Sequence, residues 1–277
     1  MKPQYQLFRG GSRTYFNSTL FFPPQVRREV FVLYGFVRKA DNFVDSVPQQ
    51  VDGFVAYRNA YRNALAGTPS GDPVIDDFVA LIGQRQLAPE WVEAFLHAME
   101  MDLSRKTYRT LEQTLEYIYG SAEVIGLFMA QIMRLSPEAH YAARMLGRAM
   151  QYINFIRDIE EDNGFGRTYL PLDETTLQSL ESTEAAANRK EFVRFISAQL
   201  DRYQQWQQEA ARGFSLIPLR YRVAVKTAAD MYHWTGRVIR NDPMIVYRYK
   251  VKPGRIRIFT QVARNALIDR KEAPVYA

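Results

Sequence analysis

Helix start signals recur along this chain, whereas no stretch shows sustained alternation of apolar and polar residues between hairpin turns. Proline and capping residues predict helix starts at Pro23-Pro24, Asp72-Pro73, Pro89 and Thr110. We therefore expect an all-α fold. No repeat, low-complexity tract or convincing linker divides the sequence, so the simplest expectation is one helical domain over residues 1–277.

The composition is that of a globular protein, with 47% hydrophobic and 24% charged residues in 277. The absence of cysteine excludes disulfides, thiolate metal sites and cysteine nucleophiles. The first residues lack the apolar core of a signal peptide, and no apolar run approaches the ~18 residues of a membrane span. These features favour a cytoplasmic protein.

A polar stripe runs along the expected helix that precedes an Asn163-Gly164 break. Gln151, Asn154, Asp158 and Asp162 project into an arc of roughly 80° at 100° per residue. Amide and carboxylate oxygens on one stripe suit a hard cation such as Mg²⁺. In an arbitrary helix, however, such a stripe is more often a solvated face.

A second stripe lies on the helix that starts at Pro23-Pro24. Tyr34, Arg38, Asp41 and Asp45 fall within an arc of roughly 60°. By itself an Arg-Asp stripe is commonly a surface ion pair of little energetic value. Two such stripes in one chain indicate two carboxylate-bearing helices that face each other across a cavity.

Such a pair of helices would hold divalent ions against a diphosphate whose apolar tail lies in the cavity. Loss of the diphosphate from an allylic carbon leaves a carbocation. The 13% aromatic content could supply ring faces to stabilise that cation. This chemistry requires no nucleophilic side chain.

The two stripes lie in segments that resemble known motifs. Gln151–Pro171 resembles the motif Q-x-x-N-x-x-R-D-x-x-E-D followed by G-R-x-Y-L-P, and 33–45 resembles its partner aspartate motif. Weaker similarities cover 11–15 and 119–126. On these residues the chain resembles the squalene and phytoene synthases, the head-to-head prenyl transferases, from about Gly11 to Arg257.

The resemblance implies an isoprenoid-synthase-type helical bundle around a central apolar cavity, with Mg²⁺, or Mn²⁺ in its place, as the cofactor. The metal ligands it implies are Asp41, Asp45, Asn154, Asp158 and Asp162. The substrate-binding residues it implies are Ser12, Tyr34, Arg38, Gln151, Asn154, Arg157, Tyr232 and Arg248. Tyr169 joins the four aspartates in the implied catalytic set. Geometry alone places Arg157 off the polar stripe, where it could pair with Glu161 instead.

One departure concerns Asn42, which stands where many phytoene synthases carry a second aspartate. Asn42 lies about 100° from Asp41 on the helix, so the Asp41 and Asp45 pair can still chelate.

Three functions stay open on the sequence. The first is phytoene synthase, which joins two C20 geranylgeranyl diphosphates through a cyclopropylcarbinyl diphosphate and for which NADPH is not expected. The second is squalene or dehydrosqualene synthase, which uses two C15 farnesyl diphosphates. The third, more remote, is a non-catalytic lipid-surface or assembly factor. Its expected sign is loss of the aspartate motifs, which are intact here.

The C-terminal end is basic, with Arg248, Lys250, Lys252, Arg255 and Arg257 and no acidic residue among them. Peripheral contact with the inner face of a membrane is one interpretation, and a solvated basic segment is another. Nucleic-acid binding is not expected, because the net charge is only +6 and no docking motif is present.

Overall fold

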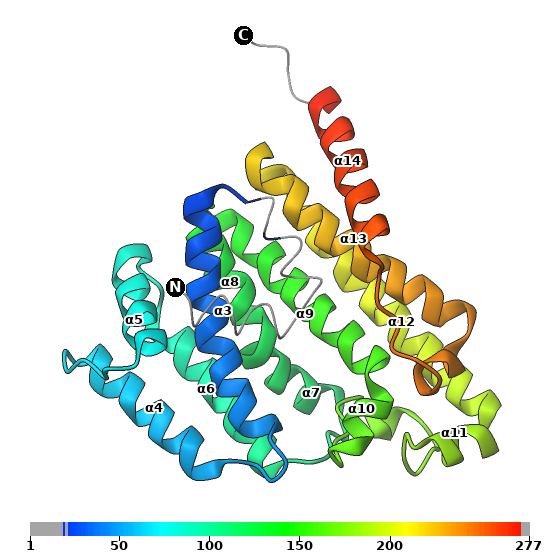
Figure 1. Cartoon of the computed structure of the whole chain (residues 1–277). Coiled ribbons are helices and arrows are strands. Elements are labelled where there is room, and N and C mark those ends of the chain that lie inside the picture. Colours follow the sequence, from blue (N-terminus) through cyan, green and yellow to red (C-terminus); the bar gives the residue numbers. More distant parts are fainter. Residues whose placement is uncertain (1–18, 20–21, 273–277) are drawn as a thin grey trace.

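The structure is a computed structural model that describes residue 19 and residues 22–272. Within these residues the only β-type pairing is an isolated bridge between Thr107 and Thr168, and the all-α prediction is confirmed (Figure 1). The helices are α3 (Pro24–Asp45), α4 (Val51–Leu65), α5 (Pro73–Arg85), α6 (Pro89–Ser104), α7 (Leu111–Ile118), α8 (Val124–Ile132), α9 (His140–Arg157), α10 (Ile159–Gly164), α11 (Ser182–Ala187), α12 (Arg189–Ala211), α13 (Leu219–Asn241) and α14 (Arg255–Glu272). None of the described helices combines the length and the apolar content that crossing a bilayer requires.

The expected helix starts are confirmed, each by a local cause. Proline occupies the first turn of α3, α5 and α6. The Asp72 side chain accepts a hydrogen bond from the backbone N–H of Val74 at 3.0 Å and so caps α5. Thr110 caps α7 by accepting from the backbone N–H of Gln113 at 3.4 Å. These bonds satisfy N–H groups that have no partner within the helix.

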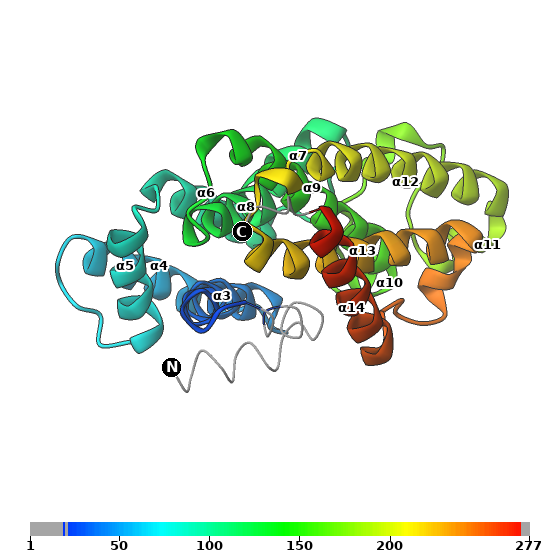
Figure 2. The same ribbon diagram turned by 90° about the horizontal axis from the view of Figure 1, so that it is seen from above.

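Helix α9 lies in the middle of the bundle, in contact with α8, α12 and α13, whereas α3 packs against α4, α5 and α6. Seen from above, α3 and α13 lie below α8 and α9 (Figure 2). Residues Ala149, Ile153 and Ile156, opposite the polar stripe, are buried in the core. This arrangement leaves the polar stripe of α9 free to face α3.

The segment between α7 and α8 departs from regular α-helical geometry. Residues Tyr119–Glu123 form a π-helix, in which the backbone N–H of Val124 donates to the carbonyl of Tyr119. The extra residue in this turn places Glu123 in the interior at 1% exposure, where Arg144 and Arg148 of α9 donate to its carboxylate at 2.9 and 2.7 Å. A buried carboxylate requires such paired donors.

Two glycines allow α8 and α9 to approach each other closely. A Cβ atom on Gly126 would lie 2.2 Å from the carbonyl oxygen of Ala143, and one on Gly147 would lie 2.3 Å from that of Ala122. Any side chain at either position would therefore push the helices apart.

Candidate active site

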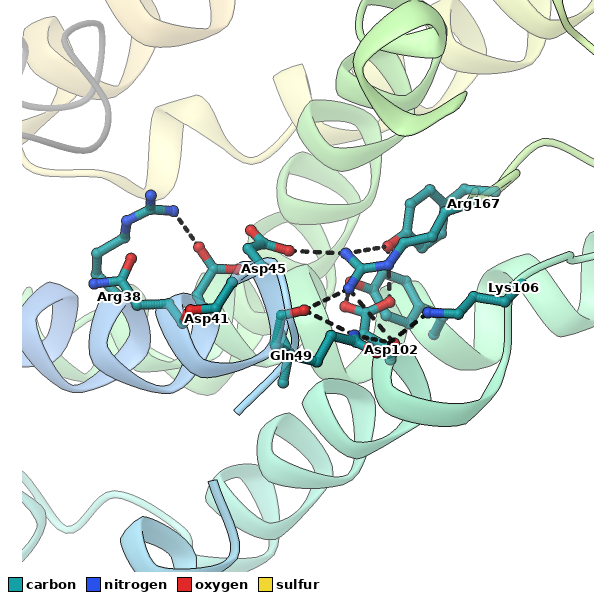
Figure 3. A network of polar contacts seen from close by, with 12 residues as sticks. Arg38, Asp41, Asp45, Gln49, Asp102, Lys106 and Arg167 are labelled. Atoms are coloured by element: carbon teal, nitrogen blue, oxygen red, sulfur yellow. Dashed lines mark hydrogen bonds and ion pairs between the residues drawn. The ribbon is translucent and has the colours of Figure 1, made fainter. Parts of the chain in front are cut away.

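The carboxylates of α3 come from the end of a helix whose opposite side is buried. Asp41 pairs with Arg38, and Asp45, one turn later on α3, points toward Arg167 (Figure 3). Burial and then the charge of Asp45 raise the pKa of Asp41, Arg38 acts against both, and the net pKa is about 7. A carboxyl whose pKa is raised by a like charge is a group that a divalent cation would stabilise in its ionised form.

The polar stripe of α9 bends where the sequence indicates a continuous helix. Helix α9 ends at Arg157, and Asp158 adopts φ −101° and ψ 15° between α9 and α10. The i to i−4 hydrogen bonds nevertheless continue, from Asp158 N–H to Asn154 and from Asp162 N–H to Asp158, both at 2.8 Å. The bend therefore keeps Asn154, Asp158 and Asp162 in helical succession.

Basic side chains surround the acidic end of this stripe. Arg157 donates through Nε to Asp158 at 2.8 Å, so its partner is Asp158 and not the Glu161 that the sequence suggests. Lys250, which follows α13, lies 3.1 Å from Asp158 and also pairs with Glu161. Burial raises the pKa of Asp162 well above its usual value, and the charges of Asp158 and Glu161 add to the effect.

Arg167 connects the two stripes. Its backbone N–H donates to the carbonyl of Asp162 at 2.8 Å, while its Nη1 donates to the carboxylate of Asp45 at 2.8 Å. Its Nη2 donates to the carbonyl of Val44 at 2.7 Å. The two acidic segments are therefore one arginine side chain apart, as the facing-helices prediction requires.

A buried aspartate lies behind this contact. Asp102, at the end of α6 and 2% exposed, accepts hydrogen bonds from the hydroxyls of Tyr117 and Tyr169, each at 2.7 Å. Burial raises the pKa of Asp102, Arg167 and the two hydroxyls lower it, and the net pKa is about 6. Tyr169 also stacks on Phe155, with ring centroids 4.4 Å apart. The network fixes the position of Arg167 from the side opposite Asp45.

Sequence reasoning assigned no role to Asp102, Tyr117 or Arg167. Arg167 lies in the G-R-x-Y-L-P segment, which could have indicated a function. A signal for Asp102 was also present, because it continues the apolar stripe of Phe95 and Met99 on α6. An acidic residue at a position expected to be buried needs partners.

An apolar cavity of about 270 Å³ opens between the two stripes. Tyr34 and Val37 of α3 and Gln151 and Asn154 of α9 contribute to its wall. Farther along, the lining is almost entirely apolar and includes Ile125, Met129, Met133, Leu146, Phe214, Ile217 and Val225. The predicted cavity is confirmed, and its polar lining residues Gln151 and Asn154 lie within two turns of Asp158.

The oxygen atoms at this end suit a hard divalent cation. Asn154 donates to Gln151 at 3.4 Å, but its own Oδ1 is buried and has no hydrogen-bond partner among the described residues. Within residues 19 and 22–272, no three acidic or histidine side chains are close enough to enclose an ion by themselves. Mg²⁺ fits such a set, because it takes one or two carboxylates and completes its shell with water and phosphate oxygens.

Other predicted site residues lie in different settings. Ser12 falls outside the described residues. Tyr232 is buried on α13 beside Arg157. Burial lowers the pKa of Arg157, but Asp158 and then Tyr232 raise it, and the net pKa is above the usual value. Arg248 is 58% exposed and pairs with Asp242, whereas Lys250 contacts Asp158 in the polar stripe that begins on α9. The substrate-binding roles of Tyr232 and Arg248 stay predictions.

An all-helical bundle with an apolar cavity between two acidic helices defines the isoprenoid-synthase class. Within that class the chain belongs to the squalene/phytoene synthase family, whose model matches residues 8–257.

Relatives of known name support the assignment. The chain is 30% identical over 243 residues to the 15-cis-phytoene synthase of Pantoea ananas, covering 82% of this chain and 78% of that protein. It is 29% identical over 252 residues to the 15-cis-phytoene synthase of a Paracoccus species, covering 87% and 82%.

Solved structures share the fold. A squalene synthase, HpnC from Alicyclobacillus acidocaldarius, superposes with a TM-score of 0.78 at 24% identity, covering 87% of this chain and 92% of that one. A dehydrosqualene synthase in complex with a ligand gives a TM-score of 0.84 at 21% identity, covering 97% and 95%.

Proposed function

We propose that this chain is a phytoene synthase that joins two C20 geranylgeranyl diphosphates head to head. Membership of the family makes it a prenyltransferase. The observation that carries the proposal is the contact of Arg167 with both Asp45 and Asp162, which lie about two helical turns beyond the cavity-lining residues Val37 and Asn154. On this proposal the two carboxylate pairs would hold a diphosphate group whose prenyl chain occupies the cavity.

We propose Mg²⁺, with Mn²⁺ as a substitute, as the cofactor of this site. Its ligands would come from Asp41, Asp45, Asn154, Asp158 and Asp162. When bound, the metal neutralises the charge that develops on the departing diphosphate. The raised pKa values of Asp41 and Asp162 and the unpartnered oxygen of Asn154 support this assignment.

The basic residues of the site form ion pairs with its carboxylates. Arg38 pairs with Asp41, and Arg157 and Lys250 pair with Asp158. When a cation satisfies the aspartates, these three side chains are free to turn toward diphosphate oxygens, as basic groups do at such sites. They would then hold the leaving group through both steps of the reaction.

The first step breaks the bond between carbon 1 and the diphosphate of one substrate. Carbon 1 adds across the double bond of the other substrate, and loss of a proton closes the cyclopropane ring. In the second step the remaining diphosphate leaves, and rearrangement with loss of another proton gives the linear C40 product. Apolar residues such as Leu33, Val37 and Met150 line the cavity and exclude water that would capture the cation.

The length of the cavity supports the C20 substrate. Its lining residues extend from Ala139, which directly precedes α9, to Asn154 on α9. Fifteen residues of helix correspond to about 22 Å, which suits an extended chain of four isoprene units. The named relatives near 30% identity are phytoene synthases, whereas the squalene-type structures at 24% and 21% identity support only the fold.

The test is product analysis with labelled C15 and C20 diphosphates, in Mg²⁺, with and without NADPH. The proposal predicts phytoene from the C20 substrate, without any need for NADPH. Squalene or dehydrosqualene from the C15 substrate, with no C20 turnover, would replace the proposal by its C15 alternative. Turnover of neither pair would contradict an enzymatic function.

We also propose that the basic C-terminal end brings the chain to a membrane surface, where apolar substrates and products accumulate. Positive charge alone does not specify how such a contact is made.

A further inference from the structure

Helix α14 turns polar groups toward the bundle. Asn265 is 3% exposed, and its Nδ2 donates to Asp230 at 2.8 Å and to the hydroxyl of Thr227 at 3.2 Å. One turn earlier, Gln261 donates to the same Asp230 carboxylate at 2.7 Å. Hydrogen bonds to α13 thus provide much of the attachment of α14, with Ile258 as a buried apolar contact.

The opposite side of α14 is apolar and exposed. Ile256, Phe259 and Leu267 keep 82%, 55% and 63% of their surface exposed. At 100° per residue these three side chains fall within an arc of roughly 80°, and Asn265 lies opposite that arc. A helix packed on a water-soluble bundle normally has the reverse distribution, with its apolar side inward. We refer to Ile256, Phe259 and Leu267 as the outer face of α14.

Positive charge borders this outer face. Arg255 lies beside it in one direction, and Arg257 and Arg264 lie beside it in the other, all three exposed. Between residues 248 and 268 the sequence contains six basic and no acidic residues. Apolar residues at the centre with arginines on both sides are typical of a helix that lies in the plane of a membrane interface.

We propose that the outer face of α14 inserts into the headgroup region of a bilayer that contains anionic lipids. The arginines would contact lipid phosphates while their aliphatic stems extend along the apolar surface. A second copy of this chain is a poorer occupant, because it would bring another basic segment against the first. The negative charge of the lipid complements both sides of the outer face.

The position of α14 would bring the membrane close to the cavity, and the role of that proximity rests on the proposed function. Thr227 of α13 contacts Asn265, and the adjacent Ala228, together with Ala224, lines the cavity. Only one helix therefore separates the outer face of α14 from the cavity. A membrane bound there lies close to the site that takes up prenyl chains and releases an apolar product.

The experiment is sedimentation of the full chain with vesicles, in the absence of substrate. One set of vesicles contains phosphatidylglycerol and phosphatidylcholine, and the other phosphatidylcholine alone. The chain should bind the anionic vesicles, and binding should weaken with salt. The double variant Ile256→Ser/Phe259→Ser should lower the partition coefficient at least about tenfold, since two large apolar side chains no longer insert.

The matched control is Val51→Ser/Leu65→Ser, which removes two exposed apolar side chains from α4 and should leave vesicle binding unchanged. Circular dichroism checks that both variants keep their helix content. The proposal is overturned if the α14 variant binds as the parent does, or if the parent does not bind anionic vesicles. It is also overturned if light scattering shows that the parent is a dimer and the α14 variant a monomer, while both bind the anionic vesicles equally. Turnover of detergent-dispersed substrate, measured separately, tests the proposed function and should be unchanged in both variants.

Discussion

Arg167 donates to the carboxylate of Asp45 at 2.8 Å across a sequence separation of 122 residues. The same arginine binds the carbonyl of Asp162 through its backbone N–H. One residue thus sets the spacing of the two acidic segments. Backbone hydrogen bonds of Thr168 with Lys106 and Tyr108, at 2.8 and 2.9 Å, hold this turn against the loop after α6.

Arg167→Lys should weaken the site although it conserves the charge. Lysine cannot reproduce the planar fork that reaches both Asp45 and the carbonyl of Val44. We expect kcat/KM to fall about tenfold or more and the Mg²⁺ concentration for half-maximal activity to rise. Arg167→Met should in addition cost about 3–5 kcal/mol of unfolding free energy, because Asp102 and Asp45 lose a buried charge partner. A Mg²⁺ titration of the lysine variant that matches the parent would contradict this role.

Asp158→Asn and Asp162→Asn should both abolish turnover but change stability in opposite directions. Asp158 is bound by Arg157 and Lys250, so removing its charge leaves both cations without that partner. The pKa of Asp162 is raised by burial and by neighbouring acids, so neutralising it relieves repulsion. Without Mg²⁺ the expected changes are on the order of 1 kcal/mol, a loss for Asp158→Asn and a gain for Asp162→Asn. Chemical denaturation measures both, and equal shifts of the same sign would refute the assignment.

Asp102 should make stability depend on pH. Its pKa is about 6 in the folded chain, above the ordinary value of 3.8, so the protonated form stabilises the folded state. That contribution is complete below about pH 4 and is lost as the pH rises through 6, at a cost of about 3 kcal/mol. Asp102→Asn removes this titration. As the pH rises from 4 to 7, the unfolding free energy of the variant should therefore fall less than that of the parent. Parallel pH profiles for the two chains would show that Asp102 does not titrate in this range.

Met129→Trp should shorten the accepted substrate. Met129 lines the cavity on α8, toward the end distant from Asn154. A tryptophan there fills space needed by the last isoprene unit of a C20 chain. We expect C20 turnover to fall about tenfold or more while C15 turnover is retained, and Met129→Leu serves as the volume-conserving control. Chromatography of labelled products provides the measurement, and an unchanged preference would place the chain end elsewhere.

The local features of this fold could be predicted from the sequence because their causes are local. Pro24, Asp72 and Thr110 determine helix starts within one turn. The two polar stripes follow from helical periodicity, which survives the bend at Asp158. No proline marks that bend or the π-helix at Tyr119–Glu123, so helical periodicity alone does not distinguish either of them from a regular helix.

The contacts that complete the site depend on distant parts of the chain. Asp102 meets Tyr169 across 67 residues, and Lys250 reaches Glu161 across 89. Helical periodicity carries no information about such pairs. Helix α14 was described from the sequence only as a basic end, because its inward side is polar and its outward side apolar, the reverse of the usual pattern.

The most direct test of this account is a crystal structure of the chain with Mg²⁺ and a non-reactive thio-diphosphate analogue of the C20 substrate. The account predicts metal-bound diphosphate between Asp41 and Asp45 on one side and Asp158 and Asp162 on the other, with the prenyl chain extending past Met129. A diphosphate bound away from these aspartates, or a prenyl chain outside the cavity, would contradict it.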